Sequence, residues 1–135
     1  MRVYLAHQFA YRQLGEVVTR LLELLGYEVY NPFRNTDQTG SGEYIFNRDL
    51  EAIGESDCVL AILKRGETGW GVCMEMMYAY TIGKPVVCYL LSPEMRNHPF
   101  LSFTQVCTEW REVEASLKVL SMGRGEDVSE RVGTD

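Results

Sequence analysis

The sequence predicts an α/β fold with three layers, a doubly wound parallel sheet with helices on both faces. Apolar runs of strand length alternate with segments whose apolar residues recur at helical spacing, and there is no internal repeat. One run, CVLAIL at residues 58–63, is apolar throughout, as expected for a central parallel strand covered on both faces. The alternation implies right-handed crossovers between parallel strands. With 135 residues, the chain is long enough for one compact domain and too short for two ordinary ones.

Two strands and one helix are predicted at the start of the chain. Val3 to Ala6 is a short apolar run that fits a buried strand. Tyr11 to Leu25 has leucine and valine at helical spacing, and Gly26 follows as a C-cap. Tyr27 to Tyr30 is the second strand. The polar residues 34–43, RNTDQTGSGE, predict a loop.

The middle of the chain predicts two helices, one on each side of the central apolar run. The first extends from about Tyr44 to Glu55, and one of its faces is apolar: Ile45, Phe46, Leu50 and Ile53. A glycine-rich loop, KRGETGWG at residues 64–71, follows the central run. The second helix holds Glu75 and continues to about Ile82.

The last third predicts one more strand, VVCYLL at residues 86–91. The loop SPEMRNHPF and a mixed stretch follow it, and a helix is expected around Val113 to Leu120. Residues 1–122 are therefore assigned to one domain. The polar, glycine-containing residues 123–135 are interpreted as a disordered tail.

Composition and charge exclude several classes of protein. The net charge of −6 argues against a nucleic-acid partner, because phosphate binding needs a clustered basic surface. No apolar run is long enough to span a bilayer, so no membrane partner is expected. The start of the chain, MRVYLAHQF, lacks the pattern of a signal peptide and fits a first strand. We therefore expect a cytoplasmic protein.

Neither the cysteines nor the histidines predict a metal site. The chain has four cysteines, and no two of them form a CxxC pair: Cys58, Cys73, Cys88 and Cys107. Three of the four lie in apolar runs, which favours inert thiols. The two histidines, His7 and His98, have no partner at metal-ligand spacing. The glycine-rich loop lacks the ending of a P-loop, and no GxGxxG follows the first strand. We expect neither a metal nor a cofactor.

Doubly wound sheets bind their ligands beyond the carboxyl ends of the strands. Four segments follow such ends in this chain: HQF (7–9), NPF (31–33), KRGETGWG (64–71) and the loop after Leu91. Phe9, Phe33 and Trp70 are candidate walls for a flat ligand, and His7 is a candidate contact. Ordinary packing under a loop is the alternative for the two phenylalanines, and a loop histidine without a role is the alternative for His7.

Glu75 is unusual because it lies within an apolar segment, VCMEMMYA at residues 72–79. We expect it near the first turn of its helix, where the helix dipole favours an ionised carboxylate. A carboxylate buried without partners is costly or stays protonated. Held ionised in a dry cleft, it is suited to attack a sugar anomeric carbon. The alternative is an exposed helix residue or a carboxylate that binds backbone N–H groups of the first turn.

Two aspartates are candidates for a second carboxylate of such a site. Asp49 is on the helix before the central strand, and a functional role and a solvated helix residue both remain open for it. Asp57 is at the start of that strand, at the end of the sheet opposite to the expected site. We therefore interpret Asp57 as a cap or turn residue.

Over about residues 2–120 the chain resembles the nucleoside 2-deoxyribosyltransferase family, which includes related nucleoside 5′-monophosphate N-glycosidases. Four segments carry the resemblance by their order and spacing: VYLAHQF, YEVYNPF, NRDLEAIGESDCVLAIL and GWGVCMEMMYAYTIGKPVV. The resemblance implies a flavodoxin-like fold and cleavage of the N-glycosidic bond of 2′-deoxynucleosides or nucleotides. It also implies transfer of the sugar to another base or to water, without a metal.

The resemblance implies roles for individual residues as well. Glu75 matches the nucleophile that forms a glycosyl-enzyme intermediate, Asp49 matches the carboxyl group that assists proton transfer to the departing base, and Tyr4 matches a tyrosine aimed at the nucleophile. Asn97 matches an asparagine that binds the sugar 5′-hydroxyl in the neighbouring subunit, so a homodimer or higher homo-oligomer is expected. The expected substrate contacts are Ala6, His7, Gln8, Phe9, Phe33, Trp70, Gly71 and Asn97.

Departures from the family pattern leave the substrate open. Transferases of the family often have an aspartate before the nucleophile helix, where this chain has Gly69 and Trp70, so base recognition is expected to differ. The absence of serine at 69 and 97 favours a free 5′-hydroxyl, whereas four arginines near the site loops are candidate phosphate ligands: Arg12, Arg34, Arg65 and Arg96. A 5′-monophosphate N-glycosidase is the alternative activity. A non-catalytic nucleotide-binding module is the alternative of another class.

Overall fold

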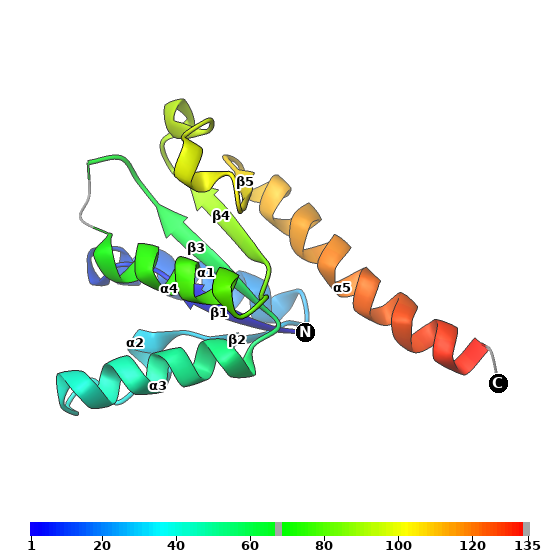
Figure 1. Ribbon diagram of the computed structural model, residues 1–135, viewed down its shortest axis with the longest axis horizontal. Coiled ribbons are helices and arrows are strands. Elements are labelled where there is room, and N and C mark those ends of the chain that lie inside the picture. Colours follow the sequence, from blue (N-terminus) through cyan, green and yellow to red (C-terminus); the bar gives the residue numbers. More distant parts are fainter. Residues whose placement is uncertain (67–68, 134–135) are drawn as a thin grey trace.

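The computed structural model describes the backbone of residues 1–66 and 69–133 and the side chains of residues 1–66 and 69–123 (Figure 1). Its strands are β1 (Arg2–Ala6), β2 (Glu28–Tyr30), β3 (Cys58–Leu63), β4 (Val86–Leu90) and β5 (Gln105–Cys107). Its α-helices are α1 (Arg12–Leu24), α2 (Pro32–Asn35), α3 (Gly42–Glu55), α4 (Trp70–Thr81) and α5 (Trp110–Gly133). Short 3-10 helices span Phe9–Tyr11, Pro93–Met95 and Pro99–Leu101.

The five strands form one sheet in the order β2-β1-β3-β4-β5, and every pairing is parallel. Parallel neighbours require crossover connections, and the helices provide them on both faces. The structure confirms the predicted α/β fold with three layers. Among the described residues, no helix combines the length and the apolar character needed to cross a bilayer.

Two separate apolar cores lie on the two faces of the sheet. On one face, α3 and α4 bury Ala52, Ile53, Val72, Met76 and Ala79. On the other face, α1 and α5 bury Val18, Leu22, Val113 and Leu117. Because side chains alternate along a strand, Tyr4 and Ala6 of β1 point toward α3 and α4, while Val3 and Leu5 point toward α1 and α5. This alternation directs Tyr4 toward the helix that holds Glu75.

Local capping fixes the segment between β2 and α3. The Asn31 side chain accepts a hydrogen bond from the N–H of Phe33, and Pro32 takes the first position of α2. Ser41 caps α3 by accepting the N–H of Tyr44 at 3.0 Å. The turn from Thr36 to Gly40 is therefore held at both ends, beside the carboxyl ends of β1 and β2.

The structure differs from the sequence prediction at several elements. The loop predicted at residues 34–43 contains the end of α2, and the mixed stretch contains β5. Helix α4 begins at Trp70, inside the predicted glycine-rich loop, so Glu75 lies in its second turn and no acidic residue is in the first. The expected stabilisation of Glu75 by the helix N-terminus is therefore wrong, because the effect fades beyond the first turn.

Helix α5 continues to Gly133, through residues predicted to form a tail. The side chains from residue 124 onward and all of residues 134–135 lie outside the described part of the chain. The division into a domain at 1–122 and a disordered tail at 123–135 stays a prediction.

Candidate active site

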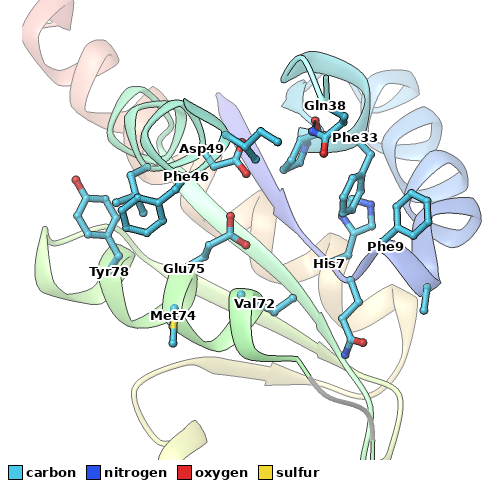
Figure 2. Close-up of a pocket in the computed structure, with 16 residues that line it drawn as sticks. His7, Phe9, Phe33, Gln38, Phe46, Asp49, Val72, Met74, Glu75 and Tyr78 are labelled. Carbon is cyan, nitrogen blue, oxygen red and sulfur yellow. Dashed lines mark hydrogen bonds between the residues drawn. The ribbon is translucent and has the colours of Figure 1, made fainter. Parts of the chain in front are cut away.

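A cleft of about 680 Å³ opens at the carboxyl ends of β1 and β2. Its walls come from the segment after β1, from the turn after β2, and from the facing sides of α3 and α4 (Figure 2). Asp49 on α3 and Glu75 on α4 are the charged residues that line it, and their carboxyl groups face each other. The cleft thus combines two carboxyl groups with mostly apolar walls.

Glu75 is half-buried, and the Tyr4 hydroxyl donates a hydrogen bond to its Oε2. Burial is the largest influence on this carboxyl group and raises its pKa to about 7. The Tyr4 hydrogen bond opposes this rise, and the charge of Asp49 adds to it. Near neutral pH, Glu75 is therefore balanced between an acid and a nucleophilic carboxylate.

Tyr4 is fully buried in β1, and its ring stacks on that of Tyr30 in β2 with centroids 5.7 Å apart. Burial raises the pKa of Tyr4 far above its usual value, and the neighbouring Glu75 charge raises it further. Tyr4 therefore remains a hydrogen-bond donor at any physiological pH. It holds one oxygen of Glu75 and leaves the other oxygen for a ligand.

Asp49 is half-buried on α3, and its Oδ1 accepts a hydrogen bond of 2.7 Å from the Thr36 hydroxyl. Burial raises the pKa of Asp49, while the Thr36 hydrogen bond and the charge of Arg48 lower it. Two carboxyl groups that share a partly desolvated cleft cannot both ionise freely. The pair can therefore hold a single proton, so that one carboxyl group is a protonated acid while the other is ionised.

Aromatic side chains form the walls on both sides of the carboxyl pair (Figure 2). Phe33 contacts His7 edge-on at 4.9 Å and Phe9 edge-on at 5.6 Å between ring centroids. Phe46 of α3 and Tyr78 of α4 lie at the other side. Such surfaces suit a flat aromatic ligand.

His7 is a buried wall residue of this cleft. Only 4% of it is exposed, and its Nδ1 lies 3.1 Å from the carbonyl oxygen of Leu5. Burial lowers the pKa of His7, and the Leu5 carbonyl opposes that shift. A neutral His7 adds shape to the wall and no charge.

Most of the predicted site residues meet at the cleft, and some do not. His7, Gln8, Phe9, Phe33, Asp49, Gly71 and Glu75 line it. Ala6 is buried in the sheet just before the cleft, and Tyr4 reaches it through Glu75. Trp70 is 71% exposed and outside the lining, so the expected stacking of the base on Trp70 has no support here. Asn97 is exposed in the loop after β4, outside the lining of its own chain's cleft.

Sequence reasoning missed three prominent lining residues, Gln38, Phe46 and Tyr78. Phe46 belongs to the predicted apolar face of its helix, yet 58% of it is exposed, and it lines the cleft. Gln38 was placed in a loop without a role. Its amide nitrogen donates to the carbonyl oxygens of Pro32 and Thr36 at 3.0 and 3.1 Å, so its side-chain oxygen is left for a ligand.

Asp57 lies at the end of the sheet opposite to the cleft, as the sequence predicted, but its hydrogen bond with Arg2 is part of neither a helix cap nor a turn. Its Oδ2 accepts the backbone N–H of Arg2 at 2.7 Å, at the amino end of the sheet. The described side chains contain no group of three or more histidine, cysteine or acidic residues that could hold a metal ion.

Comparison with known proteins places the chain in a family. The family model described as nucleoside 2-deoxyribosyltransferase matches residues 3–122. The chain belongs to this family. Among solved structures, it is similar to a 2-deoxyribosyltransferase from the psychrotolerant bacterium Bacillus psychrosaccharolyticus, with 26% identity and a TM-score of 0.74 over 84% of this chain and 90% of that one.

A second similar structure is the CMP N-glycosidase BcmB from Clostridium botulinum. It shares 21% identity with a TM-score of 0.59, over 88% of this chain and 99% of that one. At this identity the likeness shows the shared fold alone. A search of curated proteins found no match. The family membership confirms the resemblance that the sequence segments indicated.

Proposed function

We propose that this protein cleaves the N-glycosidic bond of 2′-deoxynucleosides and transfers the deoxyribosyl group to another base or to water. Glu75 is the nucleophile, Asp49 serves the departing base, and Tyr4 orients Glu75. The observation that carries the proposal is the pair of facing carboxyl groups, one of them held by a buried tyrosine, between aromatic walls. Family membership supports the same chemistry.

The reaction then follows from the two carboxyl groups. The free oxygen of ionised Glu75 attacks C1′ of the sugar, and the C1′–N bond breaks with its electron pair going to the base nitrogen. Protonated Asp49 gives its proton to the base, because a base anion is a poor leaving group. A second base or a water molecule then attacks C1′ and releases Glu75. Asp49 takes the proton that the acceptor loses, so the cycle closes.

The charge of the cleft supports an unphosphorylated substrate. Among the described residues, its lining has two carboxyl groups and no lysine or arginine. Of the four arginines that the sequence offered, Arg34 pairs with Glu16 and Glu23, and Arg96 pairs with Glu112. A 5′-phosphate would therefore enter a negatively charged cleft without a cation in its lining.

A nucleoside 5′-monophosphate N-glycosidase is the second candidate, because one arginine lies beside the cleft. The Arg12 guanidinium lies over the ring of Phe9, 4.1 Å from its centroid, and Phe9 lines the cleft. Arg12 is exposed and is close enough to the rim to meet a phosphate that projects outward. A non-catalytic binding module, the third candidate, does not need a carboxylate beside a sugar carbon.

Product analysis separates these candidates. Purified protein is incubated with 2′-deoxynucleosides or their 5′-monophosphates, with and without a free acceptor base. Base exchange from unphosphorylated nucleosides is the expected result. Free base released only from monophosphates would replace the proposal with the hydrolase, and ligand binding without any product would replace it with the binding module.

A homodimer completes the proposal. Asn97 lies outside its own cleft, and we propose that it binds the substrate 5′-hydroxyl in the cleft of a partner subunit. The family resemblance supports this role, and the exposure of Asn97 leaves it accessible to a second copy.

A further inference from the structure

A line of hydroxyl groups behind Asp49 has no part in the reaction described above. The Tyr30 and Thr36 hydroxyl oxygens are 2.6 Å apart, and Thr36 donates to Oδ1 of Asp49 at 2.7 Å. Both residues are buried, with 4% and 3% of their surface exposed. Burying a threonine hydroxyl beside a carboxyl group costs free energy unless the buried polar groups all form hydrogen bonds.

The backbone holds Thr36 firmly in this place. Its N–H donates to the carbonyl oxygen of Pro32 at 3.0 Å, and its own carbonyl oxygen accepts from the Gln38 side chain. Tyr30 is fixed in turn, because its ring stacks on Tyr4 and the guanidinium of Arg48 lies 5.1 Å from its centroid. The two hydroxyl groups therefore present a preset geometry to Asp49.

The direction of these hydrogen bonds follows from the number of hydrogens. A threonine hydroxyl has one hydrogen, and Thr36 gives it to Asp49. The bond between Thr36 and Tyr30 must then be donated by Tyr30. Oδ1 of Asp49 is an acceptor in this arrangement, so a proton on this carboxyl group has to reside on Oδ2.

We propose that Thr36, supported by Tyr30, is a positioning residue that reserves Oδ2 of Asp49 for the proton that passes to the departing base. The inference rests on the proposed role of Asp49 in catalysis. It adds which oxygen carries the proton and which residues fix that oxygen. Loss of the Thr36 hydroxyl leaves both oxygens equivalent and the carboxyl group free to rotate.

The charged and titratable groups around Asp49 determine how its pKa responds. Arg48 on α3 and the Thr36 hydroxyl lower this pKa, whereas burial raises it. Across the cleft lie Glu75 of α4 and Tyr4 of β1, whose own pKa values Asp49 raises. Replacing Thr36 by valine removes one of the two lowering influences and keeps the shape of the side chain. The pKa of Asp49 should then rise.

The first experiment reads this pKa without any substrate. Protein labelled with ¹³C at aspartate carboxyl carbons is titrated by NMR as wild type, Thr36→Val, Thr36→Ser and Thr39→Val. We expect a raised Asp49 pKa in T36V and a wild-type value in T36S, which keeps the hydroxyl. T39V is the matched control, because Thr39 in the same turn donates to Asp37 at 2.7 Å and lowers the Asp37 pKa. An unchanged Asp49 pKa in T36V would overturn the proposal.

The second experiment asks whether the hydroxyl acts on proton transfer. Turnover of T36V is measured with deoxynucleosides whose bases range from poor to good leaving groups. We expect kcat to fall by about 10- to 100-fold with poor leaving groups and to change little with good ones, in line with the usual effect of general acid catalysis. T36S should retain kcat. An equal loss with every substrate would indicate a purely structural role and would overturn the proposal.

Tyr30→Phe guards against a variant that fails to fold. It keeps the stacked ring and removes only the terminal donor, so we expect a smaller change in the same direction in both experiments. A Y30F protein with wild-type Asp49 pKa and wild-type leaving-group dependence would remove Tyr30 from the proposal. If the wild type turns over no nucleoside, the proposed function fails, while the NMR titration still decides whether Thr36 controls Asp49.

Discussion

At the scale of single residues, the unusual feature is an acidic side chain kept in a partly desolvated cleft. Glu75 has one hydrogen bond from Tyr4, and burial raises its pKa from 4.5 to about 7. The folded protein therefore binds this proton more tightly than the unfolded chain does. The free energy of unfolding falls as pH rises from about 4.5 to about 7, where the folded protein also loses the proton.

Replacing Glu75 by glutamine should therefore abolish turnover and stabilise the fold above neutral pH. We expect a gain of about 1–3 kcal/mol at pH 8 and almost none at pH 4, because a shift of one pKa unit corresponds to about 1.4 kcal/mol. Thermal or urea unfolding at both pH values measures it. Glu51→Gln, which removes an exposed carboxylate, is the control and should show little change. Equal stability of E75Q and wild type at pH 8 would argue against a buried, high-pKa Glu75.

The paired carboxyl groups predict a bell-shaped dependence of kcat/KM on pH. The productive state of the pair holds one proton, on Asp49, so activity should fall above about pH 7, where the pair loses its last proton, and fall again in acid, where both carboxyl groups are protonated. Asp49→Asn removes the proton donor and also the charge that raises the Glu75 pKa. Its residual activity should rise with pH to a plateau, with a midpoint below that of wild-type Glu75. A bell that persists in D49N would assign the proton donor to another group.

At the scale of elements, α1 and the end of β1 are fitted to each other around His7. A Cβ added to Gly15 would lie 2.2 Å from Nε2 of His7, and real Cβ atoms essentially never come within 3.0 Å of such an atom. Phe33 packs edge-on against His7, so the position of His7 determines the shape of one wall of the cleft. The glycine in α1 is thus a requirement of the site and not of the helix.

Gly15→Ala should destabilise the protein although alanine favours helices. We expect a loss of about 1–3 kcal/mol from overpacking, together with a raised KM as the His7 wall moves. Gly54→Ala in α3 is the matched control, because nothing lies within 4 Å of its added Cβ. That variant should gain up to about 1 kcal/mol from helix propensity. Unfolding curves of both variants measure the contrast, and a stabilised G15A would contradict the close fit.

The helices and strands also show how much of the fold can be predicted from the sequence alone. The long periodic segments were predicted within a few residues, since α1 and α3 have clear apolar faces. The short elements were missed: β5 has three residues at the sheet edge, and α2 has four. Neither is long enough to show a period. Helical spacing predicts the apolar face that contains Phe46, but it does not show which residues of that face are buried in the core and which line a cleft.

At the scale of the whole molecule, the strand order explains why distant segments meet. Strands β1 and β3 are neighbours, and the connections after β1 and β2 begin at the same edge of the sheet. The family resemblance implied the pairing of Glu75 with Asp49, and the structure brings the two helices together on one face of that sheet. The hydrogen bond from Thr36 to Asp49 could not, because it depends on the three-dimensional path of a turn.

The proposed homodimer leads to a prediction that can be tested only on the assembled dimer. If Asn97 of one subunit completes the cleft of another, Glu75→Gln and Asn97→Ala disable different halves of the same composite site. Each variant alone should have little activity. In a mixed dimer, one cleft has both residues replaced and the other has neither, so half of the clefts in mixed dimers are intact.

Refolding the two variants together at equal amounts should therefore restore about a quarter of the wild-type activity, because about half of randomly formed dimers are mixed. The assay compares the co-refolded sample with the same two proteins refolded separately and then combined, which should stay inactive until subunits exchange. A sample that stays inactive after co-refolding would place Asn97 in the cleft of its own chain or outside the reaction. Since Asn97 lies outside the lining of its own cleft, restoration is the outcome that the structure favours.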